Sequence, residues 1–389
     1  MIHQLITCEY PPQVGGVSDY SRMVANGLAA AGDEVHVWCP PADVYLNDSA
    51  GSSTESPGVF VHRAFGTFTP SDLRRIGESL DRFEAPRRVL VQWVPHGYGY
   101  RSMNLQLCLW LWNRAKLKRD RVELMVHEPF LAFGEGSRKQ DGAAAIHRAM
   151  IVMLLKSAAR VWVSIPEWET RLRPFALGQK KEFTWLPVPS NIPLVEDPKG
   201  VIAIRSRISV LNGFLLGHFG AYDKYLTEIM LEVLPPLLKS NDRIQVLLVG
   251  RGSTELRERL ASQELDLAAR LHATGLVSAT EVSRHISACD AMLQPYQDGV
   301  SGRRTSVMTA LSHGVPVVTT KGTATEPVWS EGEPVLLTQA GDNPALIAAT
   351  LSLLDDSRQR DSLARAGEAL YRTQFAIEQT ISRLRAQAA

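Results

Sequence analysis

Short apolar runs alternate with longer amphipathic segments along this chain of 389 residues, and the alternation breaks off near Leu186. The chain opens with an apolar run over 3–8, which predicts a buried strand, followed by a predicted helix over 17–31 and a strand over 34–39. Strands buried on both faces form continuous apolar runs, whereas in the helices that cover them apolar residues recur about every 3.6 residues. The pattern therefore predicts an α/β fold with parallel sheets covered by helices on both faces.

The same alternation continues up to Leu186. The further predicted strands are 59–62, 88–94, 122–127, 160–164 and 182–186, and the predicted helices are 71–83, 103–118 and 142–157. The polar stretch 47–57 interrupts this series and is predicted to be a surface loop.

The break itself reads LPVPSNIPLVEDPKG and contains four prolines. Proline fixes φ and restricts the residue before it, so the stretch is predicted to be an extended linker. Beyond it the alternation restarts, with predicted strands at 215–219, 244–250, 271–275, 290–296 and 315–320 and helices at 224–238, 279–289, 303–312 and beyond 344. A chain of 389 residues is longer than one hydrophobic core usually supports, which favours two domains.

We therefore expect two Rossmann-like domains joined by a linker. The predicted divisions are 1–186 for the first domain, 187–198 for the linker, 199–370 for the second domain, and 371–389 for a C-terminal helix that could pack back on the first domain.

The formal net charge of +1 gives no indication of a nucleic-acid partner. The N-terminus has no basic segment followed by a long apolar one, as a secretory signal would have. The apolar stretch 105–112 is too short to cross a bilayer, and Lys156 and Arg160 interrupt the stretch 149–165. Cytoplasmic residence is the expectation.

Ligands of doubly wound sheets bind beyond the carboxyl ends of the strands, so the loops that follow strands are the candidate sites. The first such loop, EYPPQVGGVSDY, places Gly15 and Gly16 just before a helix. Paired glycines allow close backbone approach and leave helix N–H groups facing an anion. The loop is not a GxGxxG fingerprint, which disfavours a dinucleotide site, and a plain strand–helix turn is the alternative.

Two further loops of the first half carry polar groups. After the strand at 88–94 come His96, Tyr98, Tyr100 and Arg101, which suit a pocket for a sugar or phosphate acceptor, or else form a solvent-exposed loop. His127 ends the next strand and could donate a hydrogen bond to a sugar hydroxyl or to developing charge. A buried histidine with satisfied hydrogen bonds is the alternative.

The loop QPYQDGVSGRRTSVMTALSHGVPVVTT, from Gln294, carries the sharpest local signal in the chain. Arg303 and Arg304 lie in the first turn of its predicted helix. Cations are disfavoured at a helix N-terminus, but they become favourable if a phosphate binds there and shares its charge with them. A solvated basic turn is the alternative.

The chain resembles the retaining GT-B glycosyltransferases of family 4. The segments that carry the resemblance are PPQVGGVSDYSRMVANGLAAAGDEVHVWCP near the N-terminus and, in the second half, VLLVGRGSTELRERL, LHATGLVSATEVSRHISACDAMLQPY and ALSHGVPVVTT. The resemblance implies a nucleotide-diphosphate sugar donor in a cleft between the domains, held mainly by the C-terminal one, and an acceptor on the N-terminal one. It also implies that no metal or other cofactor is needed, because basic side chains and a helix N-terminus neutralise the diphosphate.

The resemblance also implies positions for individual residues. Gly15 and Gly16 would lie near the donor phosphates and the acceptor, and His127 would contact the donor sugar. Leu276 and Val277 would lie near the base-binding turn and act through backbone groups.

The chain departs from the family's pattern at two places. The family's two glutamates, eight positions apart, correspond here to Ser301 and Thr309. Its Arg and Lys after the first strand of the second domain have no arginine counterpart here, and Lys224 is out of register.

A diphosphate leaving group still requires cations, wherever they come from. We hypothesise that Arg303 and Arg304 take over this role and that Asp298 accepts from a sugar hydroxyl. The remaining residues of the predicted donor site are Lys224, Gly299, Ser301, Gly302 and Thr305.

The predicted function is transfer of a sugar, with retention, from a nucleotide-diphosphate sugar to an acceptor hydroxyl in bacterial glycan, glycolipid or glycoside biosynthesis. The acceptor would be a saccharide, a lipid-linked molecule or a small molecule. Two alternatives stay open: an inactive GT-B-like nucleotide-sugar-binding protein, suggested by the missing glutamates, and a sugar-nucleotide epimerase. Basic residues beside apolar ones at 112–121 and 171–181 could rest on anionic lipid, or could be solvated surface.

Overall fold

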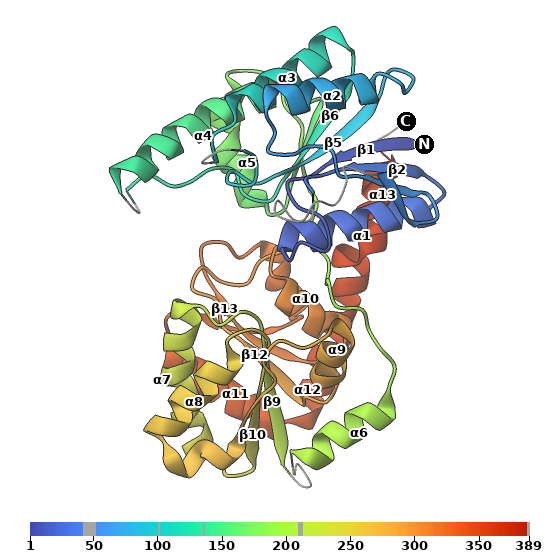
Figure 1. Cartoon of the computed structure of the whole chain (residues 1–389). Coiled ribbons are helices and arrows are strands. Elements are labelled where there is room, and N and C mark those ends of the chain that lie inside the picture. The colour runs from blue at the N-terminus through green and yellow to red at the C-terminus, as the bar shows by residue number, and fades with distance from the viewer. Residues whose placement is uncertain (42–51, 100–101, 135–136, 209–212, 387–389) are drawn as a thin grey trace. The chain divides into compact units, whose positions relative to one another are not determined.

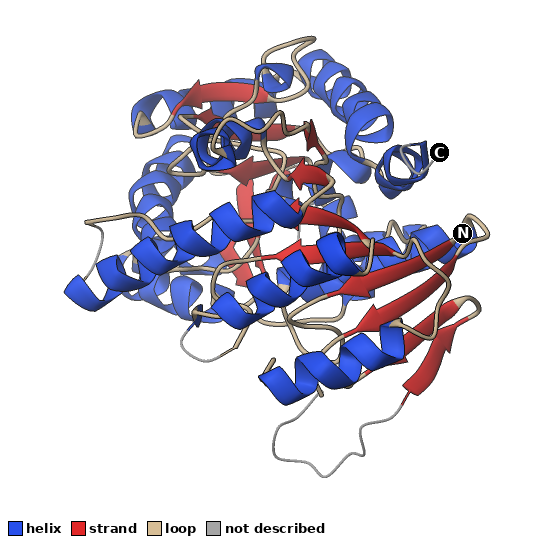
Figure 2. Cartoon of the chain, turned by 90° about the horizontal axis from the view of Figure 1, so that it is seen from above, coloured by secondary structure: helices blue, strands red, loops and turns tan. Residues whose placement is uncertain are grey.

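The computed structural model describes residues 1–41, 52–99, 102–134, 137–208 and 213–386. These residues form two compact units, one made of Met1–Pro187 with Thr380–Ala389 and the other of Val188–Gln379. Each unit is a mainly parallel sheet with helices on both faces (Figure 1, Figure 2). The predicted α/β class with two Rossmann-like domains is confirmed.

The sheet of the first unit has the strand order β3-β4-β2-β1-β5-β6-β7-β8. Its strands are β1 (Ile2–Ile6), β2 (Glu34–Trp38), β3 (Ser52–Ser56), β4 (Val59–His62), β5 (Arg88–Trp93), β6 (Arg121–Val126), β7 (Arg160–Val163) and β8 (Phe183–Trp185). Its helices are α1 (Gly16–Ala30), α2 (Pro70–Leu80), α3 (Leu105–Leu117), α4 (Arg138–Ser157), α5 (Pro166–Leu172) and α13 (Ile377–Ala386). In Figure 1, α2, α3 and α4 lie on one face of the sheet and α1 and α13 on the other.

The expectation of a loop over 47–57 is wrong for part of that stretch. Residues 52–56 form β3, the one antiparallel edge strand of the described sheet, paired with β4. Its sequence, SSTES, has no apolar run, because an edge strand on an exposed surface is held by backbone pairing and by few side chains. Residues 47–51 lie outside the described part of the chain.

The sheet of the second unit has the order β11-β10-β9-β12-β13-β14, with every neighbouring pair parallel. Its strands are β9 (Phe214–Phe219), β10 (Ile244–Val249), β11 (Leu271–Ala273), β12 (Ala291–Gln294), β13 (Val317–Lys321) and β14 (Leu336–Gln339). Its helices are α6 (Pro198–Arg207), α7 (Lys224–Ser240), α8 (Ser253–Gln263), α9 (Ala279–Ser287), α10 (Thr305–Ser312), α11 (Asn343–Asp355) and α12 (Ser357–Leu370). In Figure 1, α7, α8 and α11 cover one face, and α6, α9, α10 and α12 cover the other.

The proline-rich segment after Pro187 packs within the second unit. The Val188 N–H donates to the Gly302 carbonyl at 2.9 Å, and the Val195 N–H donates to Ser283 at 2.9 Å. The extended segment ends where the Asp197 side chain caps α6 by accepting the Gly200 N–H at 3.0 Å. At the other end of the unit, a π-helical turn over Tyr371–Phe375 leads from α12 into α13.

Candidate functional site

The strand order of the second unit reverses between β9 and β12. The chain runs outward from β9 through β10 to β11 and then returns to the other side of β9 as β12. At such a switch point the loops after the two central strands diverge and leave room for a ligand. The loop after β12 therefore occupies the place in this unit where a ligand is expected.

We call residues 298–304 of that loop the donor loop. It is folded tightly onto the end of β13 and the residues after it. The Val300 N–H donates to the Thr320 carbonyl and the Ala324 N–H to the Asp298 carbonyl, each at 2.8 Å. Gly299 has a φ of +87°, and a side chain there would overlap the backbone of Gly322. Glycine is therefore required at 299 for both reasons.

Arg303 and Arg304 share one carboxylate. Arg303 donates to Asp298 Oδ2 at 3.0 Å, and Arg304 donates to Asp298 Oδ1. Arg304 also lies over the ring of Tyr296, with 4.7 Å between the guanidinium carbon and the ring centroid. The two arginines lie just before α10, and not in its first turn as predicted, because the helix begins at Thr305; its N-terminus has no side-chain cap. Two guanidinium groups beside an uncapped helix N-terminus form a suitable place for an anion.

The two positions where the resemblance places glutamates hold small buried side chains. Ser301 is fully buried, and within the described residues its hydroxyl has no hydrogen-bond partner. Thr309 is also fully buried; its hydroxyl donates to the Thr305 carbonyl at 2.9 Å and lies 3.1 Å from the Ser190 hydroxyl. Thr305 itself opens α10, directly after the arginines. Neither Ser301 nor Thr309 carries the negative charge that a glutamate would bring.

The remaining predicted donor residues follow β9 and β11 at the same edge of the sheet. Lys224 is exposed in the first turn of α7, after the capping residue Asp223. Leu276 is 81% exposed in the turn after β11, and Val277 beside it is half-buried. An exposed leucine at the carboxyl end of a strand offers an apolar group against which a nucleotide base can pack.

In the first unit, the glycine loop after β1 already holds an anionic group. The carboxylate of Glu9 accepts the Ser18 N–H at 2.9 Å in the first turn of α1, and a side chain at Gly15 would overlap that carboxylate. Gly16, by contrast, has open space beside it. The prediction leaves this helix N-terminus free for a ligand anion, but in the structure the Glu9 carboxylate already occupies it.

His127 follows β6, and burial lowers the pKa of its imidazole to about 4. The ring is therefore neutral at neutral pH. Its Nε2 lies 2.9 Å from the Gln92 side-chain oxygen, and the ring meets Tyr20 of α1 edge-on at 4.8 Å. With Nε2 donating to Gln92, Nδ1 is an acceptor, so the imidazole can orient a sugar hydroxyl but does not act as a cation.

A cavity of about 780 Å³ opens at the carboxyl edge of the first sheet. Its walls come from the ends of β1 and β2, the loops after β4 and β5, and α4. Its apolar and polar lining residues are Cys8, Pro40, Thr67, Phe68, Thr69, Pro70, Met103, Asn104, Leu105, Gln106 and Ile146, together with Gly66, Gly97 and Gly99. The described lining thus contains amide and hydroxyl groups and apolar surface, with no charged side chain.

The loop after β5 contributes to this cavity through different residues than predicted. Tyr98 is fully buried, stacks on Trp93 and donates to the Gln92 carbonyl, so it is a core residue. His96 is exposed and does not line the cavity. Tyr100 and Arg101 lie outside the described residues. The glycines and Met103 form the wall instead.

Sequence reasoning missed two carboxylates. Glu9 lies six residues before Gly15, so nothing in the loop's sequence links it to the glycine pair. Glu326 lies 24 residues after Gly302, and both its oxygens accept the Gly302 N–H. Its isolated position in TATEPVW offers no local signal. Among the described residues, no three His, Cys, Asp or Glu side chains gather in a group that could hold a metal.

Comparison with known proteins gives a family match within the second unit. Residues 213–356 match the family model described as glycosyl transferases group 1. The chain is 31% identical over 151 residues to the phosphatidyl-myo-inositol mannosyltransferase of Mycobacterium leprae, covering 39% of each protein. It is 28% identical over 194 residues to the enzyme of that name from Mycolicibacterium smegmatis, covering 47% of this chain and 49% of that one. The chain therefore spans less than half the length of these curated relatives.

Solved structures are similar over the whole chain. Sucrose-phosphate synthase from Thermosynechococcus elongatus has a TM-score of 0.73 at 19% identity, with 100% of this chain and 98% of that one covered. Anabaena HepE in complex with UDP and glucose has a TM-score of 0.68 at 14% identity, with 99% of both chains covered. At such identities the likeness shows the fold alone. Residues 213–356 of the second unit are thus similar to the glycosyl transferases group 1, and the fold of the chain is GT-B.

Proposed function

We propose that the protein is a retaining glycosyltransferase that uses a nucleotide-diphosphate sugar. The observation that carries the proposal is the Arg303–Arg304 pair at the N-terminus of α10, placed at the switch point of a glycosyl transferases group 1 domain. The family match and the UDP bound to the structural neighbour HepE support a nucleotide-sugar donor. The proposed base contact is the turn at Leu276 and Val277.

The proposed chemistry needs no metal and no carboxylate nucleophile. The bond between the anomeric carbon and the diphosphate oxygen breaks while the two arginines and the α10 N-terminus neutralise the departing charge. The acceptor oxygen bonds to the anomeric carbon on the same face, and its proton goes to the departing diphosphate. His127 would orient a hydroxyl of the donor sugar.

The acceptor is proposed to bind in the cavity of the first unit. The described lining offers Asn104 and Gln106 amides and Thr67 and Thr69 hydroxyls for hydrogen bonds, beside apolar surface. Such a lining suits an uncharged hydroxyl-bearing group attached to an apolar one. A glycoside or glycolipid acceptor fits this description better than a phosphorylated sugar.

The test begins with a thermal-shift screen of UDP, GDP, ADP and dTDP and their common sugars, followed by a product assay with and without EDTA. Arg303→Ala and Arg304→Ala should each weaken binding of the selected nucleotide at least 10-fold, because each removes a charge-assisted contact. Arg358→Ala, which removes an exposed arginine from α12, is the matched control. Unchanged nucleotide affinity in both Arg303→Ala and Arg304→Ala would contradict the proposed role of these arginines. Tight binding with neither transfer nor hydrolysis would identify an inactive nucleotide-sugar-binding protein instead, and loss of transfer in EDTA would overturn metal independence.

We further propose that α3 rests on an anionic membrane surface, which would make the protein peripheral at the inner face of the membrane. No helix in the described part of the chain is both long and apolar enough to span a bilayer. Leu105, Leu109 and Trp112 follow one another along one face of α3 and are 43%, 49% and 36% exposed. Lys116 continues that face with positive charge, and Leu105 also lines the cavity.

The second basic segment contributes less to this surface. Arg171 is paired with Glu167 and Arg173 with Glu169, so these arginines bring no net charge. The double variant Leu109→Glu/Trp112→Glu should abolish co-sedimentation with phosphatidylglycerol vesicles at low salt. Leu265→Glu, at an exposed leucine of the second unit, should not. If the wild type fails to sediment with these vesicles, or binds phosphatidylcholine vesicles equally well, the surface is simply solvated.

A further inference from the structure

Glu326 is a buried carboxylate on a rigid support. It lies just before a short helical turn over Pro327–Trp329 and is 5% exposed. Its Oε2 accepts the Trp329 indole N–H at 2.7 Å. Trp329 is itself fully buried and stacks on Phe375, with 5.3 Å between the ring centroids. The carboxylate is therefore held in one orientation.

The carboxylate reaches one residue of the donor loop from this support. The Gly302 N–H donates to both oxygens of Glu326, at 2.9 and 3.1 Å. On the opposite side of the same residue, the Gly302 carbonyl accepts the Val188 N–H at 2.9 Å. Gly302 has no side chain with which to anchor itself, so these two backbone contacts hold it.

The backbone at Gly302 sets the position of the two arginines that follow it. Gly302 directly precedes Arg303 and Arg304, and the chain enters α10 immediately after them. The direction in which the backbone leaves Gly302 therefore decides where both guanidinium groups point. Charged side chains that bind a ligand must be held close to their binding geometry, and hydrogen bonds to the supporting backbone do this.

Burial of this carboxylate is unfavourable by itself. Desolvation raises the pKa of Glu326 to about 7, even though the Gly302 and Trp329 N–H groups and nearby Arg303 act in the opposite direction. Three other carboxylates of the described chain are at least as buried, and Asp33, Asp120 and Glu123 are paired with arginines at 3.0, 2.6 and 2.9 Å. Strongly perturbed groups next to a candidate site are more often functional than groups elsewhere.

We propose that Glu326 is a positioning residue for the donor diphosphate: it holds the Gly302 N–H and thereby presents Arg303 and Arg304 to the donor. This inference rests on the proposed function. A diphosphate bound by these arginines brings negative charge close to the carboxylate and favours its protonated form. Nucleotide binding should therefore be coupled to proton uptake by Glu326.

The experiment measures binding of the nucleoside diphosphate selected in the screen by isothermal titration at pH 7, in two buffers of different ionisation enthalpy. The variants are Glu326→Gln, Trp329→Phe, Arg303→Ala and the double variant Glu326→Gln/Arg303→Ala. Glu331→Gln, which changes an exposed glutamate five residues away, is the matched control. We expect Glu326→Gln to weaken binding about 10-fold and to take up fewer protons than the wild type, whereas Glu331→Gln behaves like the wild type. Trp329→Phe removes one hydrogen bond to the carboxylate, so it can take the place of Glu326→Gln in the experiment if Glu326→Gln does not fold.

The double variant separates positioning from general destabilisation. If Glu326 acts through the arginines, Glu326→Gln/Arg303→Ala should bind no more than about 2-fold more weakly than Arg303→Ala alone. Additive losses, or equal proton uptake and equal affinity in wild type and Glu326→Gln, would overturn the positioning role. A wild type that binds none of the nucleotides would instead overturn the proposed function itself.

Discussion

Asp298 accepts hydrogen bonds from both guanidinium groups that the proposed donor diphosphate would meet. The three side chains are 27–32% exposed, so each ion pair contributes only about 0–1 kcal/mol. A diphosphate carries more charge and more acceptor oxygens than one carboxylate. At the scale of single residues, the proposed donor binding is therefore a replacement of Asp298 by phosphate on cations that are already oriented.

Asp298→Asn tests this replacement. Removing the competing charge should tighten binding of a nucleoside diphosphate by about 3–10-fold, measured by isothermal titration at low salt. If Asp298 instead contacts a sugar hydroxyl, the variant should leave the affinity for the nucleoside diphosphate unchanged. It should then weaken binding of the nucleotide sugar only.

The pH dependence of stability tests the buried state of Glu326. Its pKa is raised from 4.5 to about 7, so the folded protein keeps a proton that the unfolded chain releases between these values. The stability contributed by this group is therefore present below about pH 4.5 and is lost as the pH rises toward 7. The melting temperature of the wild type should fall relative to that of Glu326→Gln between pH 5 and pH 8. A constant difference would contradict the raised pKa.

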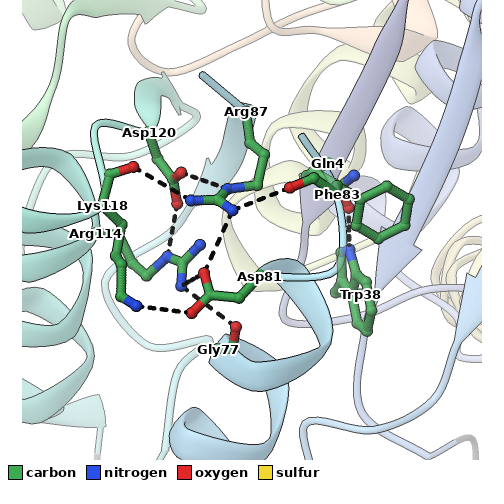
Figure 3. Close-up of polar contacts among 9 residues, drawn as sticks. All are labelled: Gln4, Trp38, Gly77, Asp81, Phe83, Arg87, Arg114, Lys118 and Asp120. Atoms are coloured by element: carbon green, nitrogen blue, oxygen red, sulfur yellow. Dashed lines mark hydrogen bonds and ion pairs between the residues drawn. The ribbon is translucent and has the colours of Figure 1, made fainter. Parts of the chain in front are cut away.

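At the scale of elements, an ion-pair network joins α2, α3 and β5 in the first unit (Figure 3). Asp120 accepts from Arg87 and from Arg114, each at 2.6 Å, and its carboxylate is completely buried. Arg114 also reaches Asp81 at 2.7 Å, and Asp81 pairs with Lys118 at 2.9 Å. The network fixes the amino-terminal end of β5 against the helices, so the loop after β5 can line the cavity from a fixed strand.

Removing the central carboxylate should be costly. Asp120→Ala leaves two buried guanidinium groups without their shared partner and should lower the free energy of unfolding by about 3–5 kcal/mol. Asp81→Ala, at a 33%-exposed side chain, should lower it by about 1 kcal/mol or less. Urea denaturation followed by tryptophan fluorescence measures both. Equal losses in the two variants would show that burial does not decide the effect.

The sequence predicted most of these elements because their signal is local. The strand at 59–62 matches β4, and the helix at 224–238 matches all but the last turn of α7. The sequence-based prediction left out the helices α5, α6 and α8. It also left out β3 and β14, which are short edge strands. Their apolar pattern is weak because pairing with one neighbour holds them.

At the scale of the whole molecule, the chain leaves the first unit after Pro187 and re-enters it at Thr380. In the final helix, Leu384 is 1% exposed and its carbonyl accepts from Arg88 at 2.7 Å, while Arg385 pairs with Asp33 at 3.0 Å. The first unit is thus built from two separate segments of the chain, and its stability depends on the segment that begins at Thr380.

Leu384→Ala should therefore destabilise the first unit by about 2–5 kcal/mol through loss of buried apolar volume. Nucleotide affinity, which is assigned to the second unit, should stay within about 2-fold of the wild type. Ala386→Ser, at an exposed position of the same helix, is the control. Differential scanning calorimetry with and without the nucleotide distinguishes the two units. A loss of nucleotide affinity equal to that of Arg303→Ala would contradict this division.

The sequence by itself determined the alternation of strands and helices, the break at the proline-rich segment and the presence of Arg303 and Arg304 at a helix N-terminus. These features depend on neighbouring residues, because hydrophobic period, proline geometry and helix termini are local properties. The tertiary structure alone decided that Glu326 holds Gly302, that Glu9 occupies the α1 N-terminus and that Tyr98 is a core residue. Partners such as Gly302 and Glu326, 24 residues apart, meet only when two parallel strands bring their carboxyl ends to one edge of the sheet.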